Sequence, residues 1–429
     1  MKVNVKEISP TEREMHFEQS WEDIQKDYRA FEKKFAKDIQ LPGFRKGMVP
    51  LNIIEKKFGP RLNYDFVNEK FPDYYSQALK EEELTPVSQP ELLDLDFKKG
   101  DPLKLKLKFE VMPEWELPEY KNKLSLEKYD YEIADTDVKE SIDRLRQNAA
   151  EVVNVENGAK SGHHIVADVK ELDKDGKVVN ESEDTRVILG QDPFTGENES
   201  AMLGAKPGET RRISLKADRE EEGVHTFELK IKSVEEHILP EVNDEFAQTV
   251  SPETETVDAL RKRVREELES QWEKQSETRL EEQIADFFID KLKDVQLPES
   301  VVNEQAKNIY EDMKKRYPSA PEMDEKTAIE NYRDTAEKSL KWQLVKNKIV
   351  GDNDIKVEEE DVKARIDEML KGVDKEMRET YEKYYQSPQI KNQLHDDIIN
   401  KKLIDHLRSQ AKIKNKKVSR KARLKETGQ

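Results

Sequence analysis

The residues with the clearest chemistry form one short run, Gly43-Phe44-Arg45-Lys46-Gly47-Met48-Val49-Pro50. The two glycines permit a tight, exposed turn, because glycine accepts backbone angles that other residues avoid. Phe44 is surrounded by Gly, Pro and charge, so it has few local partners to pack against. The guanidinium of Arg45 suits bidentate contact with a carboxylate or a phosphate. The run predicts a docking tip for a partly apolar, partly phosphate surface; the alternative is that Phe44 folds back into its own domain.

Other chemistry-bearing residues do not form a recognisable site. The chain has no cysteine, which excludes a disulfide framework and a thiolate metal site. His163 and His164 are adjacent, which points their rings to opposite faces of a strand, and a surface position is favoured for them. There is no Gly-rich phosphate loop, so nucleotide binding is not expected. We expect neither a metal nor a cofactor.

The elements around residues 43–50, which we call the docking run, predict an N-terminal α+β unit. Residues 2–8 alternate as a half-buried strand does, and 13–18 are the expected hairpin partner. Ser20 is a candidate cap for a helix with one apolar face. That face contains Trp21, Ile24, Tyr28, Phe31 and Phe35. The docking run then leads into helical stretches to about Glu83, and Leu103, Leu105, Leu107 and Phe109 alternate with lysines as a strand does.

The rest of the chain predicts a linker, a strand-rich block and a helical region. The linker, 113–149, ends in a charged helix near 137–148. The strand-rich block has hairpin turns at Asp175-Gly176 and Pro207-Gly208. From about Asn243 nearly everything favours helix, and a basic tail follows Lys412 as a solubility feature or an RNA contact. The prediction is a multidomain α+β protein with parts 1–112, 113–149, 150–236 and 237–429.

Composition limits the partners. The 429 residues carry a formal net charge of -18, and 39% of them are charged. An acidic protein binds nucleic acid poorly by bulk electrostatics, so DNA is not expected as a partner, although a local basic patch could still contact RNA. The first residues contain no apolar signal core, and no stretch approaches a membrane-spanning length. We expect a soluble cytoplasmic protein that does not bind membranes.

The docking run resembles the ribosome-binding motif of bacterial trigger factors, Gly-Phe-Arg-x-Gly-x-x-Pro, and matches every fixed position. Its place between two helices of an N-terminal α+β domain also resembles the place of that motif in the family. Residues 239–247 resemble the family's junction between its isomerase-like and helical domains. Residues 295–300 resemble a helix start in the family's C-terminal domain. The resemblance therefore extends along the whole chain.

The resemblance implies an ATP-independent chaperone that binds nascent and unfolded polypeptides at the exit tunnel of the large ribosomal subunit. Gly43, Phe44, Arg45, Lys46, Gly47 and Pro50 would make the ribosome contact. A helical C-terminal domain with two arms would hold clients. Methionines in this region could repack against varied clients, although for each of them a position in the core is an equally favoured alternative; they are Met313, Met323, Met369 and Met377. A weak homodimer away from the ribosome is a further association that the resemblance allows.

The strand-rich block resembles an FKBP-type prolyl isomerase, whose pocket of aromatics holds a proline ring. Val169, Val179 and Glu197 stand where we expect parts of that pocket, and the flap shrinks to 218–223. Phe194 and Phe227 are the aromatics left in the block, either as pocket walls or, as we favour, as core. We predict little or no isomerase activity; the alternative is an active FKBP-type peptidyl-prolyl cis-trans isomerase.

Overall fold

The computed structural model describes residues 1–173, 176–216, 224–371, 373–385 and 387–426. The chain divides into two compact units. The first contains residues 1–127 and 279–414, and the second contains residues 128–278 and 415–429. Among the described helices, none is long and apolar enough to cross a membrane.

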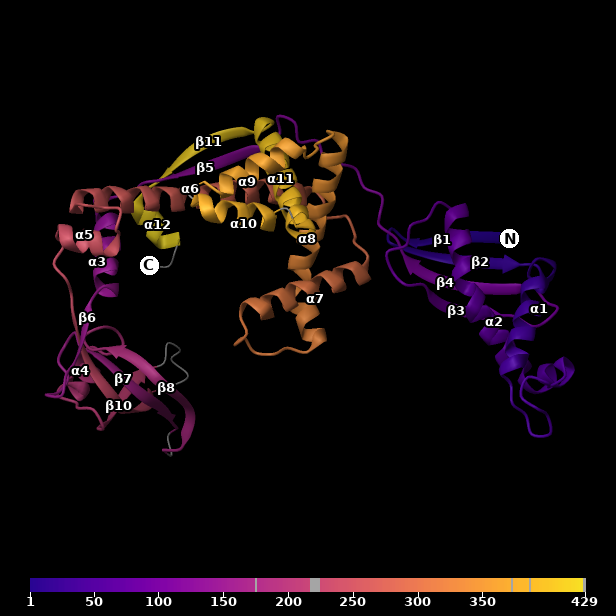
Figure 1. Cartoon of the computed structure of the whole chain (residues 1–429), viewed down its shortest axis with the longest axis horizontal. Coiled ribbons are helices and arrows are strands. Elements are labelled where there is room, and N and C mark those ends of the chain that lie inside the picture. The colour runs from indigo at the N-terminus through magenta and orange to yellow at the C-terminus, as the bar shows by residue number, and fades with distance from the viewer. Residues whose placement is uncertain (174–175, 217–223, 372, 386, 427–429) are drawn as a thin grey trace. The chain divides into compact units, whose positions relative to one another are not determined.

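The first unit begins with a four-stranded antiparallel sheet of order β1-β2-β4-β3. Its strands are β1 (Lys2–Ser9), β2 (Glu12–Gln19), β3 (Glu91–Asp96) and β4 (Leu103–Glu110). Helices α1 (Trp21–Asp38) and α2 (Leu51–Glu81) cover one face (Figure 1). The predicted hairpin is confirmed, and Ser20 caps α1 by accepting a hydrogen bond from the backbone N–H of Asp23. We call β1–β4 with α1 and α2 the N-terminal module.

The alternation along β4 explains why the sheet has one apolar face. Leu103, Leu105, Leu107 and Phe109 are buried, whereas the lysines between them point to the other side. The buried row packs against Tyr28 and Phe66 of the two helices in one hydrophobic cluster. Because successive side chains of a strand point to opposite faces of the sheet, this segment has one face in the core and one charged face.

The first unit also contains most of the helical region. Its helices are the end of α6 (Val257–Lys291), then α7 (Glu299–Arg316), α8 (Glu325–Asp352), α9 (Glu359–Met369), α10 (Lys375–Tyr385) and α11 (Pro388–Ser409). Phe288, Val345 and Leu407 are completely buried in one cluster. The segment 112–124, which follows the N-terminal module and which we call the connector, adds Tyr120 and Leu124 to this cluster. The helical C-terminal region expected from the sequence is present.

The second unit contains the strand-rich block. Its strands are β6 (Glu151–Asn154), β7 (His164–Leu172), β8 (Val178–Ile188), β9 (Thr210–Lys216) and β10 (Val224–Ile238). The sheet order is β6-β10-β7-β8, and β9 also pairs with β10. The hairpin predicted at Pro207-Gly208 is wrong, because that turn joins helix α4 (Gly196–Met202) to β9 rather than two strands. Asp175, in the other predicted hairpin turn, lies outside the described residues.

The second unit also contains helices from distant parts of the sequence. They are α3 (Asp135–Asn148), α5 (Asp244–Val250), the start of α6 and α12 (Arg420–Glu426). Part of the basic tail forms β11 (Lys412–Val418), which pairs with β5 (Ser125–Tyr131). The sequence predicted neither of these strands, so the tail is a structural element rather than a free extension.

Candidate functional site

The docking run lies in the loop between α1 and α2. The backbone N–H of Phe44 donates to the carbonyl of Leu41 at 3.0 Å, and that of Gly47 donates to the carbonyl of Ile39 at 3.3 Å. Gly43 and Gly47 have φ of +91° and +79°, which strongly favours glycine at both positions. At Gly47, an added Cβ would also lie only 3.2 Å from the carbonyl oxygen of Lys37.

Burial at the base of the loop leaves its tip exposed. Val49 is buried in a small cluster with Ala36 and Ile54, and the carbonyl of Pro50 accepts the first hydrogen bonds of α2. Phe44 is 38% exposed and joins none of the hydrophobic clusters formed by the described residues. The ring therefore does not fold back into its own domain, which was the alternative left open by the sequence.

The exposed tip combines apolar and cationic groups. Arg45 and Lys46 are exposed, and neither forms an ion pair within the described part of the chain. Met48, at 70% exposure, and Leu51 add apolar surface that the sequence argument did not include. Such a tip can contact an apolar patch and, through Arg45, donate two hydrogen bonds to a phosphate or carboxylate.

In the strand-rich block, the pocket candidates lie in the core. Phe194 is buried, and Phe227 and Val169 pack against the same hydrophobic cluster. Val179, on β8, is 65% exposed, and Glu197 is exposed in the first turn of α4. The structure thus brings Phe194, Phe227 and Val169 into one hydrophobic cluster, and the other two positions are exposed and do not belong to it. The expected flap, 218–223, lies outside the described residues.

The paired histidines are not both surface residues. His163 is buried, which contradicts the surface position favoured from the sequence, and its Nδ1 accepts a hydrogen bond from the backbone N–H of Lys160 at 3.3 Å. His164 instead stacks on His237 of β10, with ring centroids 3.7 Å apart. Burial lowers the pKa of His164, and the neighbouring His237 lowers it further. Among the described residues, no group of three or more His, Cys, Asp or Glu side chains could hold a metal ion.

The methionines of the helical region differ in exposure. Met313 and Met323 are half-buried. The backbone N–H of Met323 donates a hydrogen bond to the hydroxyl of Tyr310. Met369 and Met377 are 40% and 52% exposed. Tyr381 and Tyr384 of α10 are exposed as well. The end of α9 and helix α10 therefore present adaptable apolar side chains to solvent.

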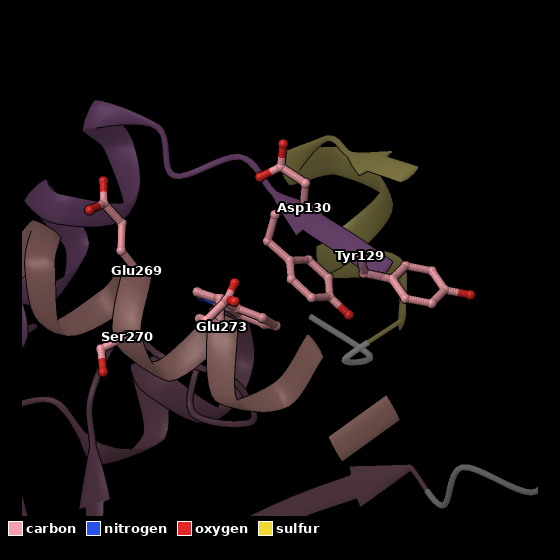
Figure 2. Close-up of a pocket in the computed structure, with 7 residues that line it drawn as sticks. Tyr129, Asp130, Glu269, Ser270 and Glu273 are labelled. Atoms are coloured by element: carbon pink, nitrogen blue, oxygen red, sulfur yellow. The ribbon is translucent and has the colours of Figure 1, made fainter. Parts of the chain in front are cut away.

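A pocket that the sequence did not predict lies between β5 and α6 in the second unit, with a volume of about 400 Å³. It is lined by Tyr129, Asp130, Tyr131, Glu269, Ser270, Trp272 and Glu273 (Figure 2). The rings of Tyr131 and Trp272 are 4.8 Å apart between centroids. Aromatic faces beside carboxylates favour a cationic group, and the chain's own cations already lie there, with Lys416 over the Tyr129 ring and Arg423 over the Trp272 ring. The signal was hidden because β5 was not recognised as a strand.

Together these parts define a multidomain α+β protein with an N-terminal module that presents an exposed loop, a small β-rich part and a helical C-terminal region. Residues 1–145 match the family model described as bacterial trigger factor protein, and residues 256–409 match the model of its C-terminus.

Relatives cover nearly the whole chain. A trigger factor of Natranaerobius thermophilus is 30% identical over 404 residues, which is 89% of this chain and 89% of that protein. One of Hahella chejuensis is 25% identical over 426 residues, 98% of this chain and 95% of that protein. A solved chain from work on substrate recognition by the trigger factor chaperone aligns over 95% of this chain and 99% of its own length, at 17% identity and a TM-score of 0.47.

The chain therefore belongs to the bacterial trigger factor family. The coarse function expected from the sequence, a chaperone that associates with ribosomes, follows from this membership.

Proposed function

We propose that the chain is an ATP-independent chaperone that docks beside the exit tunnel of the large ribosomal subunit and shields nascent polypeptides in the cytoplasm. Gly43, Phe44, Arg45, Lys46, Gly47 and Pro50 form the docking site. The glycines and Pro50 set the backbone of the loop, and the three side chains between them make the contact.

The observation that carries this proposal is the contrast between the base and the tip of the loop. Val49 is 5% exposed and fixes the base, whereas Phe44, Arg45 and Lys46 are exposed. Met48 and Leu51 of the same segment are also exposed. Exposed apolar side chains that lie together and are bordered by charge mark interaction sites, whereas a single exposed apolar residue does not. The adjacent cations suit a surface that contains phosphates.

The first prediction concerns this loop. Replacing Phe44, Arg45 and Lys46 together with alanine should abolish co-sedimentation with ribosomes, because both the apolar and the cationic contacts are removed. The fold should persist, since all three side chains are exposed. Added salt should weaken binding of the parent chain, because screening reduces interactions between exposed charges.

A matched control replaces an aromatic and two cations elsewhere on the N-terminal module. Tyr64 of α2 is 54% exposed, and Lys2 and Lys6 of β1 are exposed. The triple variant Tyr64→Ala, Lys2→Ala, Lys6→Ala should still sediment with ribosomes. Binding that survives in the loop variant, or is lost equally in the control, would show that the docking site lies elsewhere.

Client binding is proposed for the helical region, where Met369 and Met377 are exposed on helices of the first unit. Unbranched methionine side chains adapt to varied apolar partners, which suits weak and promiscuous binding of unfolded segments. The division into parts 1–112, 113–149, 150–236 and 237–429 belongs to the same proposal, as does a weak homodimer away from the ribosome.

A further inference from the structure

Within the first unit, the N-terminal module and the helical region have separate hydrophobic cores. The clusters of the module contain only residues up to Val111. Those of the helical region begin at Trp115. No cluster of described residues in this unit contains side chains from both bodies. Bodies that share no apolar interface are expected to move relative to one another unless polar contacts hold them.

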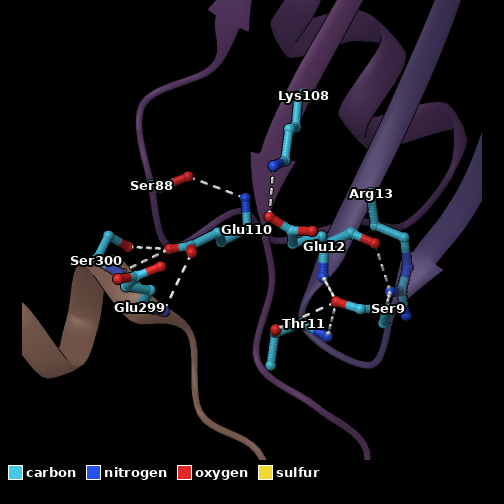
Figure 3. A network of polar contacts seen from close by, with 9 residues as sticks. All are labelled: Ser9, Thr11, Glu12, Arg13, Ser88, Lys108, Glu110, Glu299 and Ser300. Carbon is cyan, nitrogen blue, oxygen red and sulfur yellow. Dashed lines mark hydrogen bonds and ion pairs between the residues drawn. The ribbon is translucent and has the colours of Figure 1, made fainter.

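A polar contact between the two bodies centres on Glu110, the last residue of β4 (Figure 3). Its Oε1 accepts a hydrogen bond from the backbone N–H of Glu299 at 3.0 Å, and its Oε2 accepts one from the backbone N–H of Ser300, also at 3.0 Å. The hydroxyl of Ser300 donates to the same Oε2. One carboxylate thus receives three hydrogen bonds from the first turn of α7.

Helix α7 has no cap of its own at this end. Its N-cap residue is Pro298, which forms no side-chain capping bond. The first N–H groups of a helix have no partners within the helix and carry partial positive charge, so a carboxylate placed there is stabilising. Here that carboxylate comes from a residue nearly two hundred positions earlier in the chain, which couples the start of α7 to the end of β4.

The surrounding contacts hold Glu110 in place on its own side. Its backbone N–H donates to the hydroxyl of Ser88 at 2.9 Å. Across the sheet it faces Glu12 of β2, which is a like-charge pair. Lys108 binds the carboxylate of Glu12, with Nζ 2.6 Å from Oε1. Each of the two opposed carboxylates thus has its own positive partner, and for Glu110 that partner is the start of α7.

We propose that the contact of Glu110 with Glu299 and Ser300 is a releasable latch between the N-terminal module and the helical region. When it is closed, the loop of the docking run and helices α7 and α8 move as one body. When it opens, the module remains joined through the connector that follows Val111, and the two bodies reorient. Among the described residues the two bodies share no hydrophobic cluster, so these three hydrogen bonds can be broken without unfolding either core.

The latch can be tested on the full chain by double electron–electron resonance. The sequence contains no cysteine, so two introduced cysteines carry the spin labels uniquely. Lys6 on β1 and Glu311 on α7 are exposed and provide the labelling positions. The parent chain should give a narrow distance distribution. Glu110→Ala should broaden it, because the carboxylate that receives the three hydrogen bonds is removed.

Two further variants separate release of the latch from other effects. Ser300→Asp places a carboxylate in the first turn of α7, which favours the helix but repels Glu110, so the distribution should broaden with α7 intact. Glu12→Ala removes the facing carboxylate, which does not contact α7, and should leave the distribution narrow. The latch is refuted by a broad distribution in the parent, by a narrow one in Glu110→Ala or Ser300→Asp, or by equal broadening in Glu12→Ala.

Discussion

Asp137 is the residue on which the C-terminal segment of the second unit depends most directly. Its carboxylate binds Arg423 at 2.5 Å and Arg420 at 2.8 Å. The guanidinium of Arg423 also lies 4.8 Å from the centre of the Trp272 ring, and Arg423 is only 3% exposed. Arg420 and Arg423 of the basic tail are therefore structural, and Lys416 of the tail lies over the Tyr129 ring. These three cations are not candidates for an RNA contact.

The contribution of Asp137 to the stability of the folded state depends on pH. Burial acts to raise the pKa of its carboxyl, but hydrogen bonds from Arg423, from Arg420 and from the backbone N–H of Ala134 outweigh burial and hold that pKa below its ordinary value. A carboxyl whose pKa is depressed by folding stabilises the folded state above its unfolded pKa. The contribution is lost as the pH falls through the lower, folded value.

We therefore predict that Asp137→Ala loosens the contact between α3 and α12. Removing one partner of a buried ion pair leaves Arg423 without its carboxylate and costs about 3 kcal/mol. Hydrogen–deuterium exchange of residues 135–148 in the full chain should become faster at neutral pH. At acidic pH the difference between parent and variant should shrink, because the parent's carboxyl is then protonated.

Glu140 supplies the matched control for this pair. It lies on the same helix, binds only Arg420 among the described residues, and its side chain is 53% exposed. Glu140→Ala should cost less than about 1 kcal/mol, as is usual for exposed ion pairs. Equal protection of residues 135–148 in the parent and in Asp137→Ala at neutral pH would show that the pair does not hold the segment.

At the scale of elements, the sequence predicted those whose pattern is local. The β1–β2 hairpin, the Ser20 cap of α1 and the alternation along β4 were all predicted, because each depends on residues close together in the chain. The loop between α1 and α2 was predicted as exposed, since glycine and proline bound it. The exposure of Met48 could not be predicted, because it depends on how Val49 packs beneath the loop.

The elements that the sequence missed are formed by distant partners. Strand β11 is almost entirely polar, and it exists because it pairs with β5, nearly three hundred residues earlier. Strand β3 has an irregular register between Leu92 and Asp94, which breaks the alternation that identifies a strand. Neither case offers a clean period of two, so tertiary pairing rather than local pattern determines these strands.

The strand-rich block carries the prediction most open to experiment, which is that the chain has little or no prolyl isomerase activity. Catalysis requires tighter binding of the twisted imide than of its planar states. Phe194 is buried in the core, whereas Val179 and Glu197 are exposed and do not belong to its hydrophobic cluster. An X-Pro peptide mixed with the full chain should isomerise at its uncatalysed rate, over tens to hundreds of seconds at 25 °C.

NMR exchange spectroscopy on that peptide provides the measurement. The variant Phe227→Leu tests any activity that is found, because Phe227 is half-buried and leucine can occupy part of its volume. Acceleration that rises with protein concentration and disappears in Phe227→Leu would place an active pocket beside this ring. That result would establish the isomerase alternative in place of our prediction.

At the scale of the whole molecule, one helix serves both units. The sequence shows two separate apolar stripes, one with Leu260 and Val264 and one with Ile284 and Phe288, and both lie on the continuous helix α6. The first stripe packs against α3 and α5, and the second packs in the helical core of the first unit. Small separate cores of this kind are consistent with a chain in which 34% of residues are hydrophobic.

A chain built from several small cores leaves apolar side chains on helix surfaces, and these are where we expect clients to bind. The full chain should suppress aggregation of a chemically denatured protein without ATP. Replacing Met369 and Met377 with glutamine keeps similar volume but removes apolar surface. If each methionine buries part of its surface in the complex, worth about 0.7 kcal/mol, the pair should weaken client binding by roughly tenfold.

Light scattering during dilution of the denatured client measures suppression, and Val179→Gln is the control, because Val179 is at least as exposed but lies on β8 of the other unit. The control should protect as well as the parent chain, whereas the double methionine variant should need a higher concentration for the same protection. Full protection by the double variant would exclude these methionines as the client surface. Failure of the parent chain itself to protect would instead contradict the proposed chaperone function, because holding requires no partner beyond the client.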